Sequence, residues 1–181
     1  MATIRVILVI FCFTAFGRDT VPVGNILADD VQRRKHLLSY AQLQIGVREA
    51  SGNNDGKAVE MYLQTVGLKK GPPWCAAFVS WVFQQAGYSK PRTAWSPALF
   101  GPKVKSKEII PGNLFGIWMV PLNRIGHVGL IESRQGHWIM TIEGNTNLAG
   151  GREGDGVYRK RRAIKSIHQF SDWLPPLEVV P

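Results

Sequence analysis

Cysteine is nearly absent from this sequence, which excludes a fold held together by several disulfide bonds. The 181 residues contain two cysteines, Cys12 and Cys75. Cys12 lies in an apolar leader that we expect to be removed, so Cys75 is expected to be the only cysteine of the mature chain. An exported domain that keeps an odd cysteine keeps a candidate for reactive chemistry, although a lone buried structural cysteine is the alternative.

Closely spaced metal ligands are also lacking. The sequence contains no C-x-x-C or H-E-x-x-H pair, which argues against a zinc site built from Cys75, His127 and Glu143. Glu49 and Asp55 lie with Asn53 on one loop, but this loop lacks the carboxylate density of a calcium-binding EF-hand. We therefore expect no metal and no cofactor, and we interpret the loop as a turn or a substrate-contacting segment.

No apolar run is long enough to span a bilayer. The run at residues 6–16 has about half the required length and follows a single positive charge at Arg5. Ala15-Phe16-Gly17 then offers the small residues typical of a signal-peptide cleavage site. We expect residues 1–17 to be a signal peptide, with a buried first strand as the alternative. The mature chain is then expected to be secreted, periplasmic or cell-wall associated, without a membrane span.

Acidic residues are outnumbered by basic ones. The chain has 22 Lys and Arg against 13 Asp and Glu, a formal net charge of +9. A basic exported protein is attracted to anionic polymers of the cell envelope. The run Arg159-Lys160-Arg161-Arg162 falls in a predicted strand, where alternate residues face opposite ways, and no aromatic platform accompanies it. Nucleic acid is therefore not an expected partner.

Repeats and low-complexity segments are absent as well, and what remains is typical of one globular domain. At 181 residues and 45% hydrophobic composition, the chain can fill one core but not two sizeable ones. After the signal peptide we expect an extended leader over residues 18–28. The folded domain is expected over residues 29–175, followed by a short tail over residues 176–181.

Helix patterns come first in the chain and strand patterns follow. A helix is predicted from Asp29 or Asp30 to about Ile45, and Arg33, Arg34 and Lys35 are interpreted as its solvated face. Two more helices are predicted at residues 57–66 and 75–86, and a short one within residues 95–100. Strands are predicted at residues 114–120, 127–132, 138–143 and 157–162. This order indicates an α+β domain whose N-terminal helices pack on an antiparallel sheet.

The third predicted helix places Cys75 in a reactive position. Pro72 and Pro73 are tolerated just before a helix. Apolar residues then recur at positions 75, 78, 79, 82, 83 and 86, and Gly87 is a natural stop. The N-terminus of a helix favours an anion, and the thiolate is the reactive form of cysteine. Cys75 is therefore a candidate nucleophile, and its backbone N–H is a candidate oxyanion donor.

The predicted strands supply partners for this thiol. His127 is expected at the start of a strand, after a turn at residues 124–126, and histidine is suited to act as a base. With two-residue alternation, Glu143 and Asn145 share one face of the next strand. Glu143 is then the candidate that orients the imidazole, with Asn145 as a helper. The other histidines are less well placed for the role of base.

Three segments contain these candidate residues: Trp74-Cys75-Ala76-Ala77-Phe78-Val79-Ser80-Trp81, His127-Val128-Gly129 and Glu143-Gly144-Asn145. Together they resemble the CHAP domain (cysteine, histidine-dependent amidohydrolase/peptidase), whose fold is similar to papain and to NlpC-type peptidases. They occur in the family's order, and the resemblance spans residues 41–162. NlpC-type enzymes more often have an aspartate before the cysteine and a histidine as third residue. One departure is Pro111-Gly112-Asn113, where the family often has Pro-Gly-Asp, and we interpret it as structural.

The resemblance implies an exported thiol hydrolase that cleaves amide bonds of bacterial peptidoglycan, either as an N-acetylmuramoyl-L-alanine amidase or as an endopeptidase of stem or cross-bridge peptides. It assigns Cys75 as nucleophile, His127 as base, and Glu143 with Asn145 as orienting groups. Trp74, Trp118 and Asp55 are the predicted substrate contacts. Two alternatives stay open at this point: an inactive wall-binding module of the same fold, and a thiol hydrolase acting on another amide.

Overall fold

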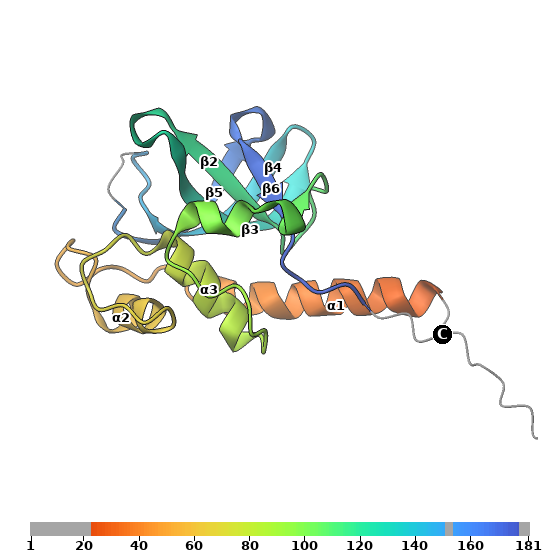
Figure 1. The fold of residues 1–181 in the computed structure, drawn as a ribbon, viewed down its shortest axis with the longest axis horizontal. Helices are drawn as coiled ribbons and strands as arrows, with labels where there is room; N and C mark the ends of the chain where they lie inside the picture. The colour runs from red at the N-terminus through yellow and green to blue at the C-terminus, as the bar shows by residue number, and fades with distance from the viewer. Residues whose placement is uncertain (1–22, 151–153, 178–181) are drawn as a thin grey trace, which may run out of the picture.

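The structure, a computed structural model, describes residues 23–150 and 154–177. The expected signal peptide, residues 1–17, and most of the expected tail lie outside these ranges. Within them the chain forms three α-helices, four short 3-10 helices and six strands (Figure 1). The helices are α1 (Val23–Gln42), α2 (Lys57–Gln64), α3 (Cys75–Gln85), η1 (Ser96–Phe100), η2 (Pro102–Val104), η3 (Val120–Leu122) and η4 (Ile164–Ser166). The strands are β1 (Lys105–Ser106), β2 (Leu114–Met119), β3 (Arg124–Gln135), β4 (Trp138–Thr146), β5 (Gly156–Ala163) and β6 (Gln169–Ser171).

The six strands form one antiparallel sheet in the order β1-β6-β2-β3-β4-β5. The pairing of β4 with β5 shifts register between Glu143 and Thr146, and a similar shift between Ile117 and Trp118 interrupts the pairing of β2 with β3. Such irregularities re-aim side chains at the end of a strand. Both shifts lie close to His127, which pairs with Ile117.

The three α-helices lie together on one side of the sheet (Figure 1). The most deeply buried is α3, in which every residue from Cys75 to Phe83 is buried. Its apolar side chains join residues of α1, α2, β3 and β4 in the main core. A smaller apolar cluster contains Phe115, Ile131 and Ile139. The α+β class, with N-terminal helices packed on a C-terminal antiparallel sheet, is thus confirmed.

The first helix is displaced from its predicted position. It runs from Val23 to Gln42, so an extended leader reaching to residue 28 is wrong for residues 23–28. Pro22 directly precedes the helix in sequence, and proline is well tolerated at that place. Asp30 does not cap the helix, because it lies inside it and accepts hydrogen bonds from Arg33 and Arg34 on the next turn.

Arg34 is not part of a solvated face, contrary to the sequence analysis. Its side chain is buried and donates to Asp30, Asp172, the carbonyl of Pro111 and the Oδ1 of Asn113. The sequence pattern could not reveal this, because the acceptors come from segments that only the fold brings together. Asn113, the departure from Pro-Gly-Asp, therefore serves this structural network.

The predicted strands are present, with two differences. The short strands β1 and β6 were not predicted, and β3 begins at Arg124 rather than at His127. The turn before β3 falls earlier, at Asn123, which follows η3 and has a left-handed conformation with φ of 49°. His127 consequently lies inside a paired strand rather than at its start. Among the described helices, none combines the length and the apolar character needed to cross a bilayer.

Candidate active site

Cys75 is the first residue of α3, as the sequence predicted, and its side chain is nearly buried. The residue before it, Trp74, has a non-helical conformation, and its carbonyl accepts the first helical hydrogen bond from Phe78. The backbone N–H groups of the first turn point away from the helix, without helical acceptors. The thiol therefore lies where the helix end favours a negative charge.

His127 reaches this thiol from β3. Its Nε2 lies 2.8 Å from Oε2 of Glu143, which leaves Nδ1 as the ring nitrogen available to the thiol. Cys75 and His127 line the same hollow, and each shifts the pKa of the other. The side chain of His127 is 9% exposed and the Glu143 side chain is fully buried. Cysteine, histidine and carboxylate thus form one connected chain of contacts, the arrangement that activates a thiol nucleophile.

The Glu143 carboxylate is held on every side. Thr141 donates its hydroxyl to Oε1 at 2.6 Å. Arg162 on β5 donates Nε to Oε1 at 2.8 Å and Nη2 to Oε2 at 2.6 Å. Burial raises the pKa of Glu143, but the hydrogen bonds and charges of Arg162 and His127 outweigh it and hold the pKa well below its usual value. The carboxylate is therefore ionised and fixed in orientation.

A glycine gives Glu143 the room to reach the imidazole. Gly129 lies on β3 beside β4, and a Cβ at this position would lie 2.8 Å from Cγ of Glu143. No real Cβ approaches a carbon so closely, so any side chain here would displace the carboxylate. Glycine is therefore required at the third position of the His127-Val128-Gly129 segment, because a larger residue would collide with Glu143.

Ser96 is a further contact of the thiol that the sequence analysis did not identify. Its Oγ lies 3.4 Å from Sγ of Cys75, and its side chain is buried at the start of η1. Burial raises the pKa of Cys75, but hydrogen bonding to His127, the imidazolium charge, and smaller contributions from Ser96 and the Val128 backbone lower it below the usual thiol value. Ser96 thus helps to hold the sulfur as a thiolate.

The imidazole shifts in the opposite direction. Burial lowers the pKa of His127, but hydrogen bonds and charge interactions with Cys75 and Glu143 raise it to about 9. A lowered thiol pKa and a raised imidazole pKa together favour a thiolate–imidazolium pair at neutral pH. The thiolate is the form of cysteine that attacks a carbonyl carbon.

Asn145 lies near His127 but does not follow the predicted alternation. It sits at the register shift of β4 and β5 with φ of 53°, so it does not continue the face of Glu143. Its side chain lines the hollows on both sides of His127. Within the described residues the imidazole is oriented by Glu143, and no hydrogen bond joins it to Asn145. The predicted helper role thus has no contact to support it.

The three residues predicted to contact the substrate differ in their burial and in their position relative to the groove. Trp74 is wrong for this role, because its side chain is fully buried and its Nε1–H donates to Glu49 at 2.8 Å. Asp55 does not line a hollow beside Cys75, and its carboxylate accepts from the backbone and hydroxyl of Ser51. Trp118 is 41% exposed and lines the hollow beside His127.

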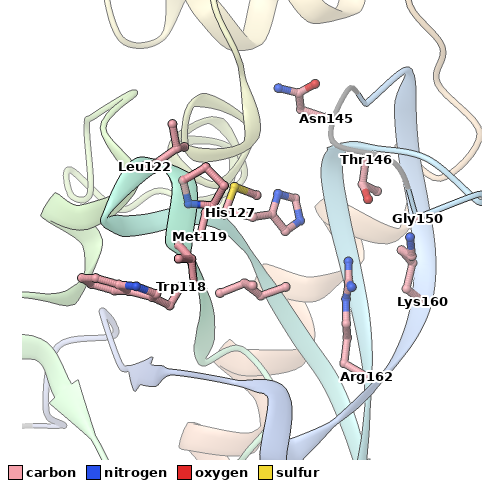
Figure 2. Close-up of a pocket in the computed structure, with 12 residues that line it drawn as sticks. Trp118, Met119, Leu122, His127, Asn145, Thr146, Gly150, Lys160 and Arg162 are labelled. Carbon is pink, nitrogen blue, oxygen red and sulfur yellow. The ribbon is translucent and has the colours of Figure 1, made fainter.

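Two hollows meet at the imidazole and form what we call the catalytic groove. The cysteine hollow has a volume of about 320 Å³ and contains Cys75, Ser96 and Trp95. The second, which we call the lysine hollow, measures about 470 Å³ and has His127 in its lining, between Trp118 and Lys160 (Figure 2). The two share four lining residues: Met119, Leu122, His127 and Asn145. The two hollows therefore adjoin at His127, and Cys75 lines one of them.

Potential metal ligands are not clustered in the described part of the chain. Over residues 23–150 and 154–177, no group of three or more His, Cys, Asp or Glu residues is arranged to hold a metal ion. In the loop that offers oxygen ligands, Glu49 already accepts hydrogen bonds from Trp74 and from the backbone of Asn54.

Comparison with known proteins supports the resemblance noted from the motifs. Residues 67–145 match the model of the CHAP domain, so the recognition of this domain is confirmed. No curated protein matches the sequence. The matched segment contains all four predicted catalytic residues, Cys75, His127, Glu143 and Asn145.

Several solved structures are similar at low sequence identity. Ly7917, crystallised with the hydrolysing product of MDP, is 17% identical with a TM-score of 0.45, covering 79% of this chain and 63% of that one. A second Ly7917 structure is 16% identical with a TM-score of 0.43, covering 76% and 60%. RipB, a peptidoglycan hydrolase from Mycobacterium tuberculosis, is 17% identical with a TM-score of 0.44, covering 86% and 69%. The chain thus spans about three fifths of the length of Ly7917.

Proposed function

Since residues 67–145 are a CHAP domain, we propose that this protein is a cysteine amidohydrolase or peptidase that cleaves amide bonds in bacterial peptidoglycan. The observation that carries the proposal is the connected set of Cys75, His127 and Glu143, in which Cys75 and His127 line the groove and the buried Glu143 holds the imidazole from behind. The basic character of the chain, with a net charge of +9, suits an anionic cell-wall substrate.

In the first half-reaction the Cys75 thiolate attacks the carbonyl carbon of the scissile amide. The developing oxyanion is held by the backbone N–H of Cys75 at the open end of α3. The His127 imidazolium then donates its proton to the amine as the C–N bond breaks, which leaves a thioester on Cys75 and a neutral imidazole.

In the second half-reaction the neutral imidazole takes a proton from water, and the hydroxide attacks the thioester carbonyl. Collapse of this second tetrahedral intermediate breaks the C–S bond, restores the thiolate and releases the product as a carboxylic acid, which loses its proton to solvent. Glu143 stays ionised throughout, because Arg162 and Thr141 hold it, and it stabilises each imidazolium state by charge and hydrogen bonding.

The proposal includes export of the protein. The expected signal peptide at residues 1–17 would deliver the domain to the compartment where peptidoglycan is found. Anionic wall polymers would then concentrate the basic protein at its substrate. Cleavage of either the lactyl amide or a peptide bond of the stem or cross-bridge is compatible with the same chemistry.

The direct test is loss of turbidity of purified peptidoglycan, with mass spectrometry of the released fragments to identify the cleaved bond. We expect lysis by the wild-type protein and none by Cys75→Ser, because the serine hydroxyl is not ionised by His127. Undiminished lysis by a folded Cys75→Ser protein would refute the assignment. Binding to the wall without any released fragment would instead favour the non-catalytic wall-binding module.

A further inference from the structure

Apart from the catalytic Cys75–His127 pair, the charged side chains among the described lining residues of the catalytic groove are all cationic. Three cationic side chains line its two hollows: Arg124 on the cysteine side, and Lys160 and Arg162 in the lysine hollow. Not one of the described lining residues is an aspartate or a glutamate. An anionic ligand would therefore be attracted into the groove, and a cationic one repelled.

The three cations are not equally available to a ligand. Arg162 is neutralised by its two hydrogen bonds to Glu143. Arg124 lies over the ring of Trp95 at 4.1 Å. Lys160 donates to the backbone carbonyl of Asn147, and no carboxylate of the described chain forms a salt bridge with it.

Lys160 is also short of compensating charge. Burial lowers the pKa of its ammonium group, and the nearby charge of Arg162 lowers it further, while Glu143 offsets only part of this effect. A ligand carboxylate at this position would raise the pKa of Lys160, because its negative charge stabilises the ammonium group. It would thereby offset both the burial of Lys160 and the repulsion by Arg162.

The opposite wall of the lysine hollow is apolar. Trp118, Met119 and Leu122 face Lys160 and Arg162 across it, with His127 between the two walls (Figure 2). A hollow with one apolar wall and one cationic wall matches an amino-acid residue that presents both carbon atoms and a carboxylate. Its position next to the imidazole places such a residue close to the scissile bond.

We propose that the lysine hollow is a subsite for a free carboxylate of the peptide substrate, with Lys160 as its cationic ligand. The inference rests on the proposed function, and it names the substrate class as stem peptides with ionised rather than amidated carboxyl groups. Two groups in a stem peptide offer this chemistry: the side carboxylate of a glutamyl residue and the carboxylate of the terminal residue.

The test uses soluble muropeptides in two matched pairs, one differing by acid or carboxamide at the glutamyl residue and the other at the terminus. For one pair we expect the wild-type kcat/KM to be about tenfold or more higher for the acid, the size of a charge-assisted hydrogen bond. Lys160→Gln should reduce this ratio to within about twofold, whereas Lys160→Arg should keep most of it. The pair that responds identifies which carboxylate is bound.

Lys107→Gln is the matched control, because Lys107 is exposed just after β1, at the opposite edge of the sheet, and loses the same charge. It should keep the wild-type preference. Equal cleavage of acid and amide by the wild type, or an unchanged preference in Lys160→Gln, would overturn the subsite.

A binding measurement distinguishes failure of the proposed function from failure of the subsite. If the wild type cleaves neither member of a pair, calorimetry with Cys75→Ser still measures whether the acid binds more tightly than the amide. A preference that Lys160→Gln abolishes in this background supports the subsite. Absence of binding, or binding indifferent to Lys160, overturns it.

Discussion

At the scale of single residues, the state of the thiol depends on charges that surround the imidazole. Glu143 adds one negative charge on the far side of His127, and Arg162 keeps that charge in place. The thiolate–imidazolium pair therefore exists between the lowered pKa of Cys75 and the raised pKa of His127, about 9. Activity is expected to rise as the thiolate forms and to fall as His127 loses its proton.

This gives a prediction for Glu143→Gln. The amide removes the negative charge that favours the imidazolium and leaves the positive charge of Arg162 nearby, so the pKa of His127 falls. The basic limb of kcat/KM against pH, near pH 9 in the wild type, should move to lower pH. The maximum should fall by about 100-fold or more. Turnover of a soluble muropeptide across pH measures both effects.

Glu132→Gln is the matched control for that experiment. Glu132 accepts two hydrogen bonds from Arg159 on the same sheet, as Glu143 does from Arg162, but it does not contact a histidine. Its variant should keep the wild-type pH profile. A basic limb that stays in place in Glu143→Gln would show that the carboxylate does not set the imidazole pKa.

The sequence identified some of these residues and not others for a physical reason. Cys75 follows from a local pattern, a helix start after two prolines, and Glu143 from a polar position in an apolar strand. Ser96 and Arg162 act through contacts with elements far away in the chain. Arg162 belongs to a basic run that, taken alone, is typical of a solvated strand. In the fold Arg162 pairs with Ile139 across β4 and β5, and its long side chain reaches the carboxylate of Glu143.

At the scale of elements, the thiol is positioned by the packing of α3 against β4. The contact is made at Gly144, between Glu143 and Asn145, where a Cβ would lie 2.7 Å from ring atoms of both Trp74 and Phe78. Trp74 directly precedes Cys75. The distance between Cys75 and the sheet that carries His127 therefore depends on the absence of a side chain at Gly144.

Gly144→Ala should move this helix. Because the rings cannot retreat within a filled core, α3 must shift by several tenths of an ångström, and Cys75 shifts with it. We expect kcat/KM to fall by about tenfold to 100-fold and the free energy of unfolding to fall by about 1–3 kcal/mol. Iodoacetamide labelling of Cys75 against pH should show a thiol pKa closer to the usual value, because the contact with His127 weakens.

Gly101→Ala is the control for this substitution. Gly101 has an ordinary φ of −65°, and a Cβ there would meet no atom within 4 Å. The turnover of Gly101→Ala and the iodoacetamide labelling of its Cys75 should equal those of the wild type. Wild-type labelling and turnover in Gly144→Ala would mean that the helix position tolerates the change.

The predictability of elements followed their length and regularity. The helices α2 and α3 and the strands β2, β4 and β5 have strong periodic patterns and were predicted to within a few residues. The strands β1 and β6 comprise two and three residues, too few for a pattern to be recognised. The start of β3 was misplaced because Arg124-Ile125-Gly126 has a turn-like composition, although Asn123 makes the turn.

At the scale of the whole molecule, segments near both ends of the described chain are joined. Arg34 on α1 binds Asp172, which follows β6, and the same guanidinium reaches Asn113 just before β2. The segment after β6 runs from the sheet down to α1 (Figure 1). Trp173 in this segment donates to the carbonyl of Leu99 in η1, the element that carries Ser96. The contacts of Arg34 with Asp172 and Asn113, which we call the clasp, therefore hold the segment whose Trp173 contacts η1. Through η1 the clasp indirectly supports the wall of the cysteine hollow.

A double-mutant cycle of Arg34→Met and Asp172→Asn measures this clasp. Arg34→Met should lower the free energy of unfolding by about 3 kcal/mol, because it leaves buried Asn113 without its donor, and the coupling to Asp172 should be about 1–2 kcal/mol. Urea denaturation of the four proteins gives both values. The pair Arg159 and Glu132 is the control: the Arg159 side chain is 47% exposed, so its coupling should stay below about 1 kcal/mol. Equal coupling in the two pairs would show that Arg34 behaves as an ordinary surface cation and that the chain ends are held by apolar contacts alone.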